Sequence, residues 1–199
     1  MHDTAPRTGS DLLLDAARRL FLAHGYANVS MQAIAAEAGM TKGAPYYHFE
    51  SKEELFYQVS LRVLEELRER LARTLDGEGS LEDRIAQSLA MLISNMSSDF
   101  SSWLNDIKRV LSHDRQKCLV EEIGSRDNLA VLVMPSFIRA AERGEIHGVS
   151  PEVACRVYFK LAMACVDEAS YLQLAGLFTD EWCEQTARDT AKVLVHGIG

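Results

Sequence analysis

Apolar residues recur every three or four positions along most of the 199-residue chain, as they do in amphipathic α-helices. The first such run covers residues 11–24 and ends at Gly25, and a longer run over residues 51–75 contains neither glycine nor proline. Further helices are predicted over residues 81–111, with a break near 97–99, and over residues 115–143, 151–175 and 180–197. The pattern therefore predicts an all-α fold.

The last two predicted helices carry more apolar surface than a single core-facing stripe. The first of them starts at Ser150-Pro151-Glu152, where a capping hydroxyl precedes a first-turn proline and an acidic residue. It has one apolar stripe through Val157 and a second through Tyr158. Because only one stripe can face the core, we predict a homodimer through residues 151–197, with two helices of each chain in a four-helix bundle. The alternative is a helix fully buried within a monomer.

The stretch from Val29 to Leu55 has the pattern of a helix-turn-helix. Ser30 can cap a short helix, and Ile34 falls on the helical face that packs inward. Gly39 then permits a tight turn with a positive φ angle. The alternative is an ordinary helical hairpin, in which Tyr46 and Tyr47 would be core residues.

A second short helix is predicted after this turn, with Thr41 as its cap, and Pro45 fits it only within the first turn. Its outward residues are small, polar or aromatic, which suits entry into the DNA major groove. Ser51 and Glu54 then form a capping box at the next helix, where Lys52 can meet a backbone phosphate. The predicted DNA-binding residues are Ser30, Thr41, Lys42, Gly43, Ala44, Tyr46, Tyr47, His48 and Lys52.

Charge is distributed unevenly along the chain. Residues 1–52 carry five basic and five acidic side chains, so the whole formal charge of −8 lies in residues 53–199. The acidity is therefore separated in sequence from the predicted DNA-binding residues. Long-range attraction to DNA should be weak, and affinity should depend on a few well-placed contacts and on dimerisation.

Three short motifs mark the first quarter of the chain. They are Phe21-x-x-x-Gly25-Tyr26, Ile34-Ala-x-x-Ala-Gly39 and Lys42-Gly-x-x-Tyr-Tyr-His-Phe-x-Ser-Lys-Glu-Glu-Leu55. Together they resemble the DNA-binding domain of TetR-type transcriptional regulators, a family whose remaining part is matched here only in length and helical character. Pro45 stands where the family more often has a bulky aliphatic residue, which leaves the local geometry of the second helix open.

This resemblance implies a three-helix DNA-binding domain over residues 1–52 and a larger helical ligand-binding and dimerisation domain over residues 53–199. It implies a repressor that binds a palindromic site in double-stranded DNA and is released by a small molecule. We expect a largely apolar effector, although each candidate taken singly is more often a plain core residue. The candidates are Met96, Phe100, Trp103, Ile107, Met134, Phe137, Tyr158 and Met163.

Other functional classes find little support in the sequence. Catalytic and nucleotide-binding motifs are missing, so we expect neither an enzyme nor a cofactor. The cysteines, Cys118, Cys155, Cys165 and Cys183, do not have zinc or C-x-x-C spacing and are expected to be reduced and mostly buried. Without a visible signal peptide or membrane span, a cytoplasmic protein is expected. The alternatives that remain are a cysteine-based redox sensor and a DNA-binding protein with a structural or cell-division role.

Overall fold

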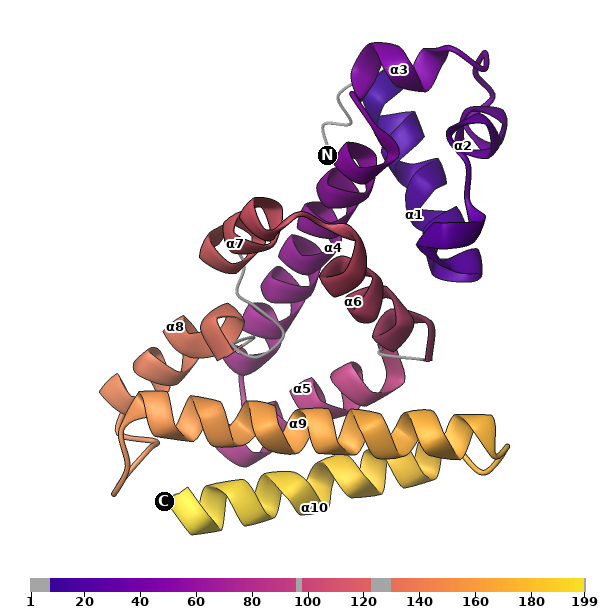
Figure 1. Ribbon diagram of the computed structural model, residues 1–199. Coiled ribbons are helices and arrows are strands. Elements are labelled where there is room, and N and C mark those ends of the chain that lie inside the picture. Colours follow the sequence, from indigo (N-terminus) through magenta and orange to yellow (C-terminus); the bar gives the residue numbers. More distant parts are fainter. Residues whose placement is uncertain (1–7, 96–97, 123–129, 199) are drawn as a thin grey trace, which may run out of the picture. The chain divides into compact units, whose positions relative to one another are not determined.

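The computed structural model describes residues 8–95, 98–122 and 130–198, and its regular elements in these residues are ten helices with no strand (Figure 1). The prediction of an all-α fold is confirmed. The helices are α1 (Gly9–Asn28), α2 (Met31–Glu37), α3 (Ala44–His48), α4 (Lys52–Leu75), α5 (Leu81–Asn95), α6 (Ser98–Val110), α7 (His113–Glu122), α8 (Ala130–Glu142), α9 (Pro151–Leu174) and α10 (Asp180–Ile198).

The chain divides into two compact units. The first unit combines Met1–Leu64 with Asp99–Cys118, and the second combines Glu65–Ser98 with Leu119–Gly199. Helix α4 contributes to both, and α6 with the start of α7 joins the first unit. A functional boundary between residues 52 and 53 stays a prediction, because these units describe packing only.

Helix α1 supplies the core of the first unit. Thr8 and Asp11 form a reciprocal capping box at its start, and hydrogen bonds from Arg62 and Thr8 hold the pKa of the Asp11 carboxyl well below its usual value. Gly25, with φ 73°, interrupts the helix near its end, as the sequence predicts. The inward face is fully apolar and consists of Leu13, Leu14, Ala16, Ala17 and Phe21.

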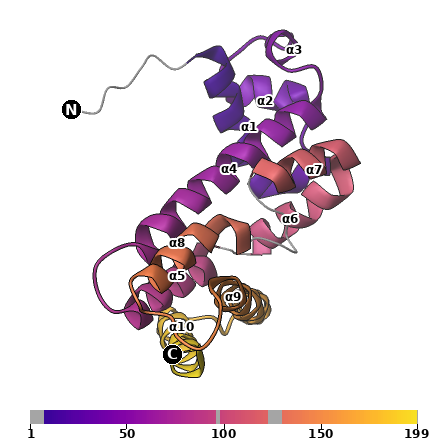
Figure 2. The same ribbon diagram turned by 90° about the vertical axis from the view of Figure 1, so that its left-hand side faces the viewer.

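The second unit is built around two long C-terminal helices. Helix α10 packs on α5, and α9 packs on both α8 and α10. In Figures 1 and 2, α9 and α10 lie side by side and run in opposite directions. Ser150 caps α9, as predicted, and Thr179 caps α10. The buried face of α9 follows the predicted stripe through Tyr158, and its members are Ala154, Cys155, Tyr158, Phe159, Ala162, Cys165, Val166 and Ala169.

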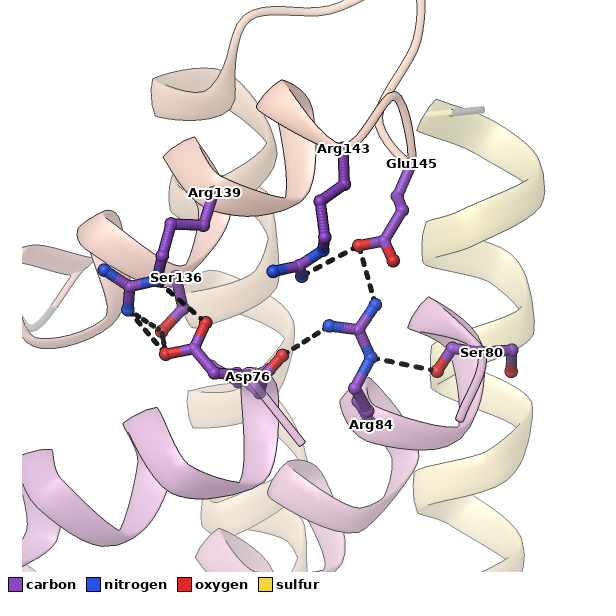
Figure 3. A network of polar contacts seen from close by, with 8 residues as sticks. Asp76, Ser80, Arg84, Ser136, Arg139, Arg143 and Glu145 are labelled. Carbon is purple, nitrogen blue, oxygen red and sulfur yellow. Dashed lines mark hydrogen bonds and ion pairs between the residues drawn. The ribbon is translucent and has the colours of Figure 1, made fainter. Parts of the chain in front are cut away.

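A buried arginine fixes the end of α4 within the second unit (Figure 3). Arg84 is 2% exposed, and its guanidinium donates to the Leu75 carbonyl at 2.7 Å, which satisfies an end group of the helix. It also forms an ion pair of 2.6 Å with Glu145. Charge pairing of this kind is needed because an unpaired buried guanidinium would be costly.

A second ion pair continues this polar network in Figure 3. Asp76 accepts hydrogen bonds from the Arg139 Nε at 3.1 Å and from the Ser136 hydroxyl at 3.1 Å. Burial raises the pKa of Asp76, but the bonds from Arg139 and Ser136 outweigh this, so the pKa is lowered overall. The network ties the loop after α4 to α8.

Across the described ranges, no helix combines the length and apolar character needed to cross a membrane.

Candidate nucleic-acid interface

Helix α2 is short and depends on its cap and on three inward residues. The Ser30 hydroxyl accepts the Ala33 N–H at 3.1 Å, which confirms the predicted N-cap. Ile34 is completely buried beneath the helix. Gly39 follows with φ 69°, so the predicted tight turn is present. The turn leads directly to the second short helix.

Helix α3 has five residues and begins later than the sequence suggests. Its N-cap is Gly43, which has no side chain to offer, so the prediction that Thr41 caps this helix was wrong. Thr41 instead accepts the Ala44 N–H through its carbonyl, at 2.9 Å, in a turn that precedes the helix. Because the helix starts late, Pro45 falls in its first turn, where a missing N–H costs no hydrogen bond.

The inward and outward sides of α3 differ sharply. Pro45 is buried, and Phe49 beyond the helix is 6% exposed. Tyr46 is 61% exposed and Tyr47 is 89% exposed. The alternative that both tyrosines are core residues is therefore excluded. Large exposed aromatic side chains, projecting from a helix that is anchored from below, are available to a binding partner.

The other predicted contact residues also lie at the surface. Ala44 is half-buried, and the exposed ones are Ser30, Thr41, Lys42, Gly43 and His48. They come from the α2 cap, the turn and α3, which are adjacent in the chain. Their arrangement is compatible with one contact surface.

Lys52 is half-buried and hydrogen-bonds to backbone carbonyls of its own unit. Its ammonium donates to the carbonyls of Tyr26 and Val29, each at 2.7 Å, and lies 4.0 Å from the centre of the Tyr26 ring. Desolvation lowers the pKa of Lys52, while the carboxylate of Asp106 opposes this shift. An ammonium has three donors, so one remains for a phosphate. The phosphate contact stays a prediction.

The helix start beside Lys52 forms half of the predicted capping box. The Ser51 hydroxyl accepts the Glu54 N–H at 3.0 Å, as expected. The Glu54 carboxylate does not complete the box but accepts from Gln58 at 3.0 Å and pairs with Arg115 at 2.5 Å. This side chain therefore joins α4 to α7.

The predicted effector residues that the structure describes are divided between the two units. Trp103 and Ile107 belong to the first unit, and Trp103 packs against Phe56 with ring centres 6.2 Å apart. Phe137 and Tyr158, in the second unit, have ring centres 5.4 Å apart and are buried. Met134 and Met163 are half-buried in the same unit, whereas Met96 and the Phe100 side chain lie outside the described residues.

Three pockets of about 460, 410 and 390 Å³ lie along α5, and none of the eight predicted effector residues lines them. Their walls come from the ends of α4 and the start of α10, with Gln87, Ala90 and Met91 of α5 shared among them. These three pockets do not test the predicted effector set, which stays a prediction.

The four cysteines lie within described residues and are free thiols. Cys155, Cys165 and Cys183 are buried, as expected for small core residues, whereas Cys118 is exposed. Burial raises the pKa of Cys155 to about 12 and also raises the pKa of Cys165. Because the thiolate is the reactive form, these two residues are poor candidates for an oxidant sensor.

The model of a known protein family, described as bacterial regulatory proteins of the tetR family, matches residues 13–59. These residues contain the capped α2, the turn and the exposed face of α3. Residues 13–59 therefore form a helix-turn-helix domain of the TetR type. Since this is a family of regulatory proteins, the match agrees with the prediction that the chain is not an enzyme.

Two relatives match parts of the chain. The probable HTH-type transcriptional regulator ArpR of Pseudomonas putida is 40% identical over 70 residues, 35% of this chain and 33% of that protein. The HTH-type transcriptional repressor KstR2 of Rhodococcus jostii is 29% identical over 124 residues, 60% of each chain. The chain therefore spans about a third and 60% of the length of these two relatives.

A solved structure extends the likeness of fold over nearly the whole chain. A TetR-family regulator from Mesorhizobium loti aligns with a TM-score of 0.78 over 96% of both chains, at 20% sequence identity. This match supports the TetR fold, with an N-terminal helix-turn-helix and a helical C-terminal part.

Two polar contacts of this region could not be predicted from the sequence. The inward role of Lys52 depends on carbonyls of residues 26 and 29, and the contact between α6 and α1 depends on Asp106. Hydrophobic periodicity reports neither, because both are polar contacts between segments distant in sequence. Asp106 itself stands between Asn105 and Ile107, a sequence context that does not mark it as buried.

Proposed function

We propose that this protein is a sequence-specific DNA-binding transcriptional regulator that recognises a palindromic site in double-stranded DNA. The exposed face of α3 is the observation that carries the proposal, since Tyr46 and Tyr47 project from a short helix anchored by the buried Pro45. A helix-turn-helix uses its second helix in this way to reach base edges in the major groove. The family match over residues 13–59 supports this assignment.

Each surface residue has a distinct proposed role. Small residues at Gly43 and Ala44 allow the backbone to approach the DNA closely, and Thr41, Lys42 and Tyr46 face the base edges of the major groove. Tyr47, His48 and Lys52 supply phosphate contacts, which fix the register of the protein on the duplex. Ser30 lies at the start of α2 and offers a hydroxyl to a neighbouring phosphate.

A homodimer through residues 151–197 would present two copies of α3. The outward face of α9 supports it, because Val153, Val157, Ala164 and Tyr171 form an exposed stripe opposite the buried face of the helix. Leu174 continues this apolar surface and is 81% exposed. Such a stripe is suited to burial against its own copy in a four-helix bundle.

Repression relieved by an effector is the proposed mode of regulation. Two relatives, KstR2 and the HTH-type transcriptional repressor DhaR of a Mycobacterium species, are named as repressors. Without effector, the dimer occupies its site and blocks transcription. A small, largely apolar molecule bound in residues 53–199 would then favour a spacing of the two α3 helices that fits DNA poorly. Coupling of about 1–3 kcal/mol would weaken binding roughly 5- to 150-fold.

DNA selection and a triple substitution test this proposal. The protein first selects duplexes from a randomised pool, and fluorescence anisotropy then measures affinity for the selected duplex over a range of salt concentrations. Lys42→Ala combined with Tyr46→Ala and Tyr47→Ala should weaken binding by about 100-fold or more, because three surface contacts are lost. Affinity of the native protein should fall steeply with salt.

Arg73→Ala is the matched control, since it removes an exposed positive charge from the second unit. It should leave binding of the selected duplex unchanged. If the triple variant keeps its helicity and still binds like the native protein, the proposed interface is wrong. Failure of the native protein to enrich any sequence would reject the proposed function itself.

A further inference from the structure

Residues 26–29, which comprise the end of α1 after Gly25 and its C-cap Val29, form the α1–α2 connection, and two side chains of opposite charge hold it. The Tyr26 N–H donates to the Oδ2 of Asp106 in α6, at 2.8 Å. From the other side, the Lys52 ammonium donates to the carbonyls of Tyr26 and Val29, each at 2.7 Å. Residues 26–29 therefore have an N–H and two carbonyls in charge-assisted hydrogen bonds, which are stronger than bonds between neutral groups.

Burial strengthens this arrangement. Asp106 is 6% exposed, and its other oxygen accepts a 2.6 Å bond from Arg109, whose own side chain is 68% exposed. The Tyr26 ring packs against Phe21 and Phe56, with ring centres 5.6 and 5.0 Å apart. Contacts on both the backbone and the side chain of Tyr26 leave this connection little freedom.

The fixed connection leads directly to the helix-turn-helix. Val29 is followed by Ser30, the N-cap of α2, and α2 leads through the turn at Gly39 to α3. Helices of seven and five residues cannot hold their own position, because isolated helices this short are unstable. Their placement must come from contacts at their ends and beneath them.

We infer that Asp106 is a positioning residue for DNA binding, and that α6, through this carboxylate, sets the point at which α2 begins. This inference rests on the proposed function, since it assumes that α3 reads DNA. Asp106 itself belongs to none of the surface segments proposed to touch the duplex. Its bond to the Tyr26 N–H fixes the path from α1 into α2, and so the placement of Tyr46 and Tyr47.

The test compares three variants on the duplex selected by the native protein. Asp106→Ala removes the acceptor and leaves the Tyr26 N–H without its partner, so binding should weaken roughly tenfold or more. Asp106→Asn retains an oxygen that can accept this N–H and should recover affinity to within about threefold of the native value. Arg109→Ala, which removes an exposed partner of the same carboxylate, should change affinity by less than about twofold.

Ser88→Ala separates positioning from general destabilisation. Ser88 is buried in the second unit and accepts the Tyr158 hydroxyl at 2.9 Å, so its removal also leaves a buried donor without a partner. The melting temperature of Ser88→Ala should fall by a few degrees, as for Asp106→Ala, while the affinity of Ser88→Ala for the selected duplex stays at the native value. The recovery of affinity in Asp106→Asn, together with this contrast, distinguishes a positioning role of Asp106 from a loss of stability.

Hydrogen exchange gives a second readout that needs no variant. In the native protein the Tyr26 amide should exchange much more slowly than exposed amides, because it is bonded and enclosed. Fast exchange at Tyr26, or a folded Asp106→Ala variant that binds the selected duplex like the native protein, would overturn the inference. A native protein that selects no duplex would instead reject the proposed function, so the two failures are distinguishable.

Discussion

The two compact units use polar contacts for different purposes. In the first unit, Asp106 and Lys52 bond to backbone groups of a short connection that leads to two short helices. In the second unit, Arg84 bonds to the end of a long helix and pairs with Glu145. Short helices depend on contacts from elsewhere for their position, whereas α9 and α10, with 24 and 19 residues, are supported by extended apolar faces.

This difference indicates where precision is required. A helix that reads DNA, as proposed for α3, must be placed to within about 0.5 Å of its binding geometry. Directional hydrogen bonds provide such placement better than apolar packing alone. A long helix tolerates small shifts, because many apolar contacts together hold it in place. Substitutions in the first unit should therefore lower DNA affinity as well as stability, whereas substitutions in the second unit should lower stability alone.

The largest expected effect comes from Phe56→Ala in the first unit. Phe56 is completely buried and contacts the rings of Phe21, Tyr26 and Trp103, so its loss leaves a cavity beneath the α1–α2 connection. The free energy of unfolding should fall by about 3–5 kcal/mol in urea denaturation. DNA affinity of the molecules that remain folded should fall as well.

The matched change Leu89→Ala, at a fully buried position of the second unit, should cost about 2–5 kcal/mol of unfolding free energy. DNA affinity of the folded fraction should then remain at the native value. Equal losses of affinity in both variants would contradict the proposed division of roles between the units.

Arg84→Met should have the next largest effect. The substitution leaves the Leu75 carbonyl without its donor and Glu145 without its buried partner, and we expect the free energy of unfolding to fall by about 3 kcal/mol. Glu145→Gln keeps a hydrogen-bond acceptor beside the arginine and serves as the milder comparison. Denaturation curves of both variants would show whether the pair or the helix-end bond matters more.

The outward stripe of α9 gives a smaller effect on folding but a clear effect on assembly. Val157 is 38% exposed, so Val157→Asp should leave the fold of one chain intact while placing a charge in the predicted dimer interface. The dimer dissociation constant should rise by about tenfold or more in analytical ultracentrifugation. Arg73→Ala, at an exposed position of α4 outside residues 151–197, is a suitable control. A native protein that is monomeric at micromolar concentration would rule out the dimer.

The smallest expected effect concerns acid stability of the second unit. The pKa of Asp76 is lower in the folded protein than in an unfolded chain, so the unfolded state binds more protons as the pH falls. This contribution to stability is present above the ordinary pKa of aspartate, about 3.9, and is lost below it. Asp76→Asn should therefore flatten the fall in unfolding free energy measured between about pH 5 and pH 3. An unchanged pH profile would show that this pair does not contribute.

Much of the fold could be predicted from the sequence because local signals mark the helix ends. Ser30 and Ser150 are caps in the structure as predicted, and Gly39 has the expected positive φ angle. Thr41 was misjudged because a hydroxyl in a suitable place is only a candidate cap. The backbone of the turn, together with the fit of Pro45 into the core, decides where α3 begins.

Periodicity and motifs contiguous in the chain were enough to predict the helical class, the helix-turn-helix and the resemblance to TetR-type regulators. The folded structure was needed to show that α6 packs with the N-terminal helices, that Lys52 bonds to backbone carbonyls and that Tyr46 and Tyr47 are exposed. A charged side chain such as Lys52 or Asp106 takes its role from the atoms that surround it. Those atoms belong to segments about 25 to 80 positions away, which no local pattern brings together.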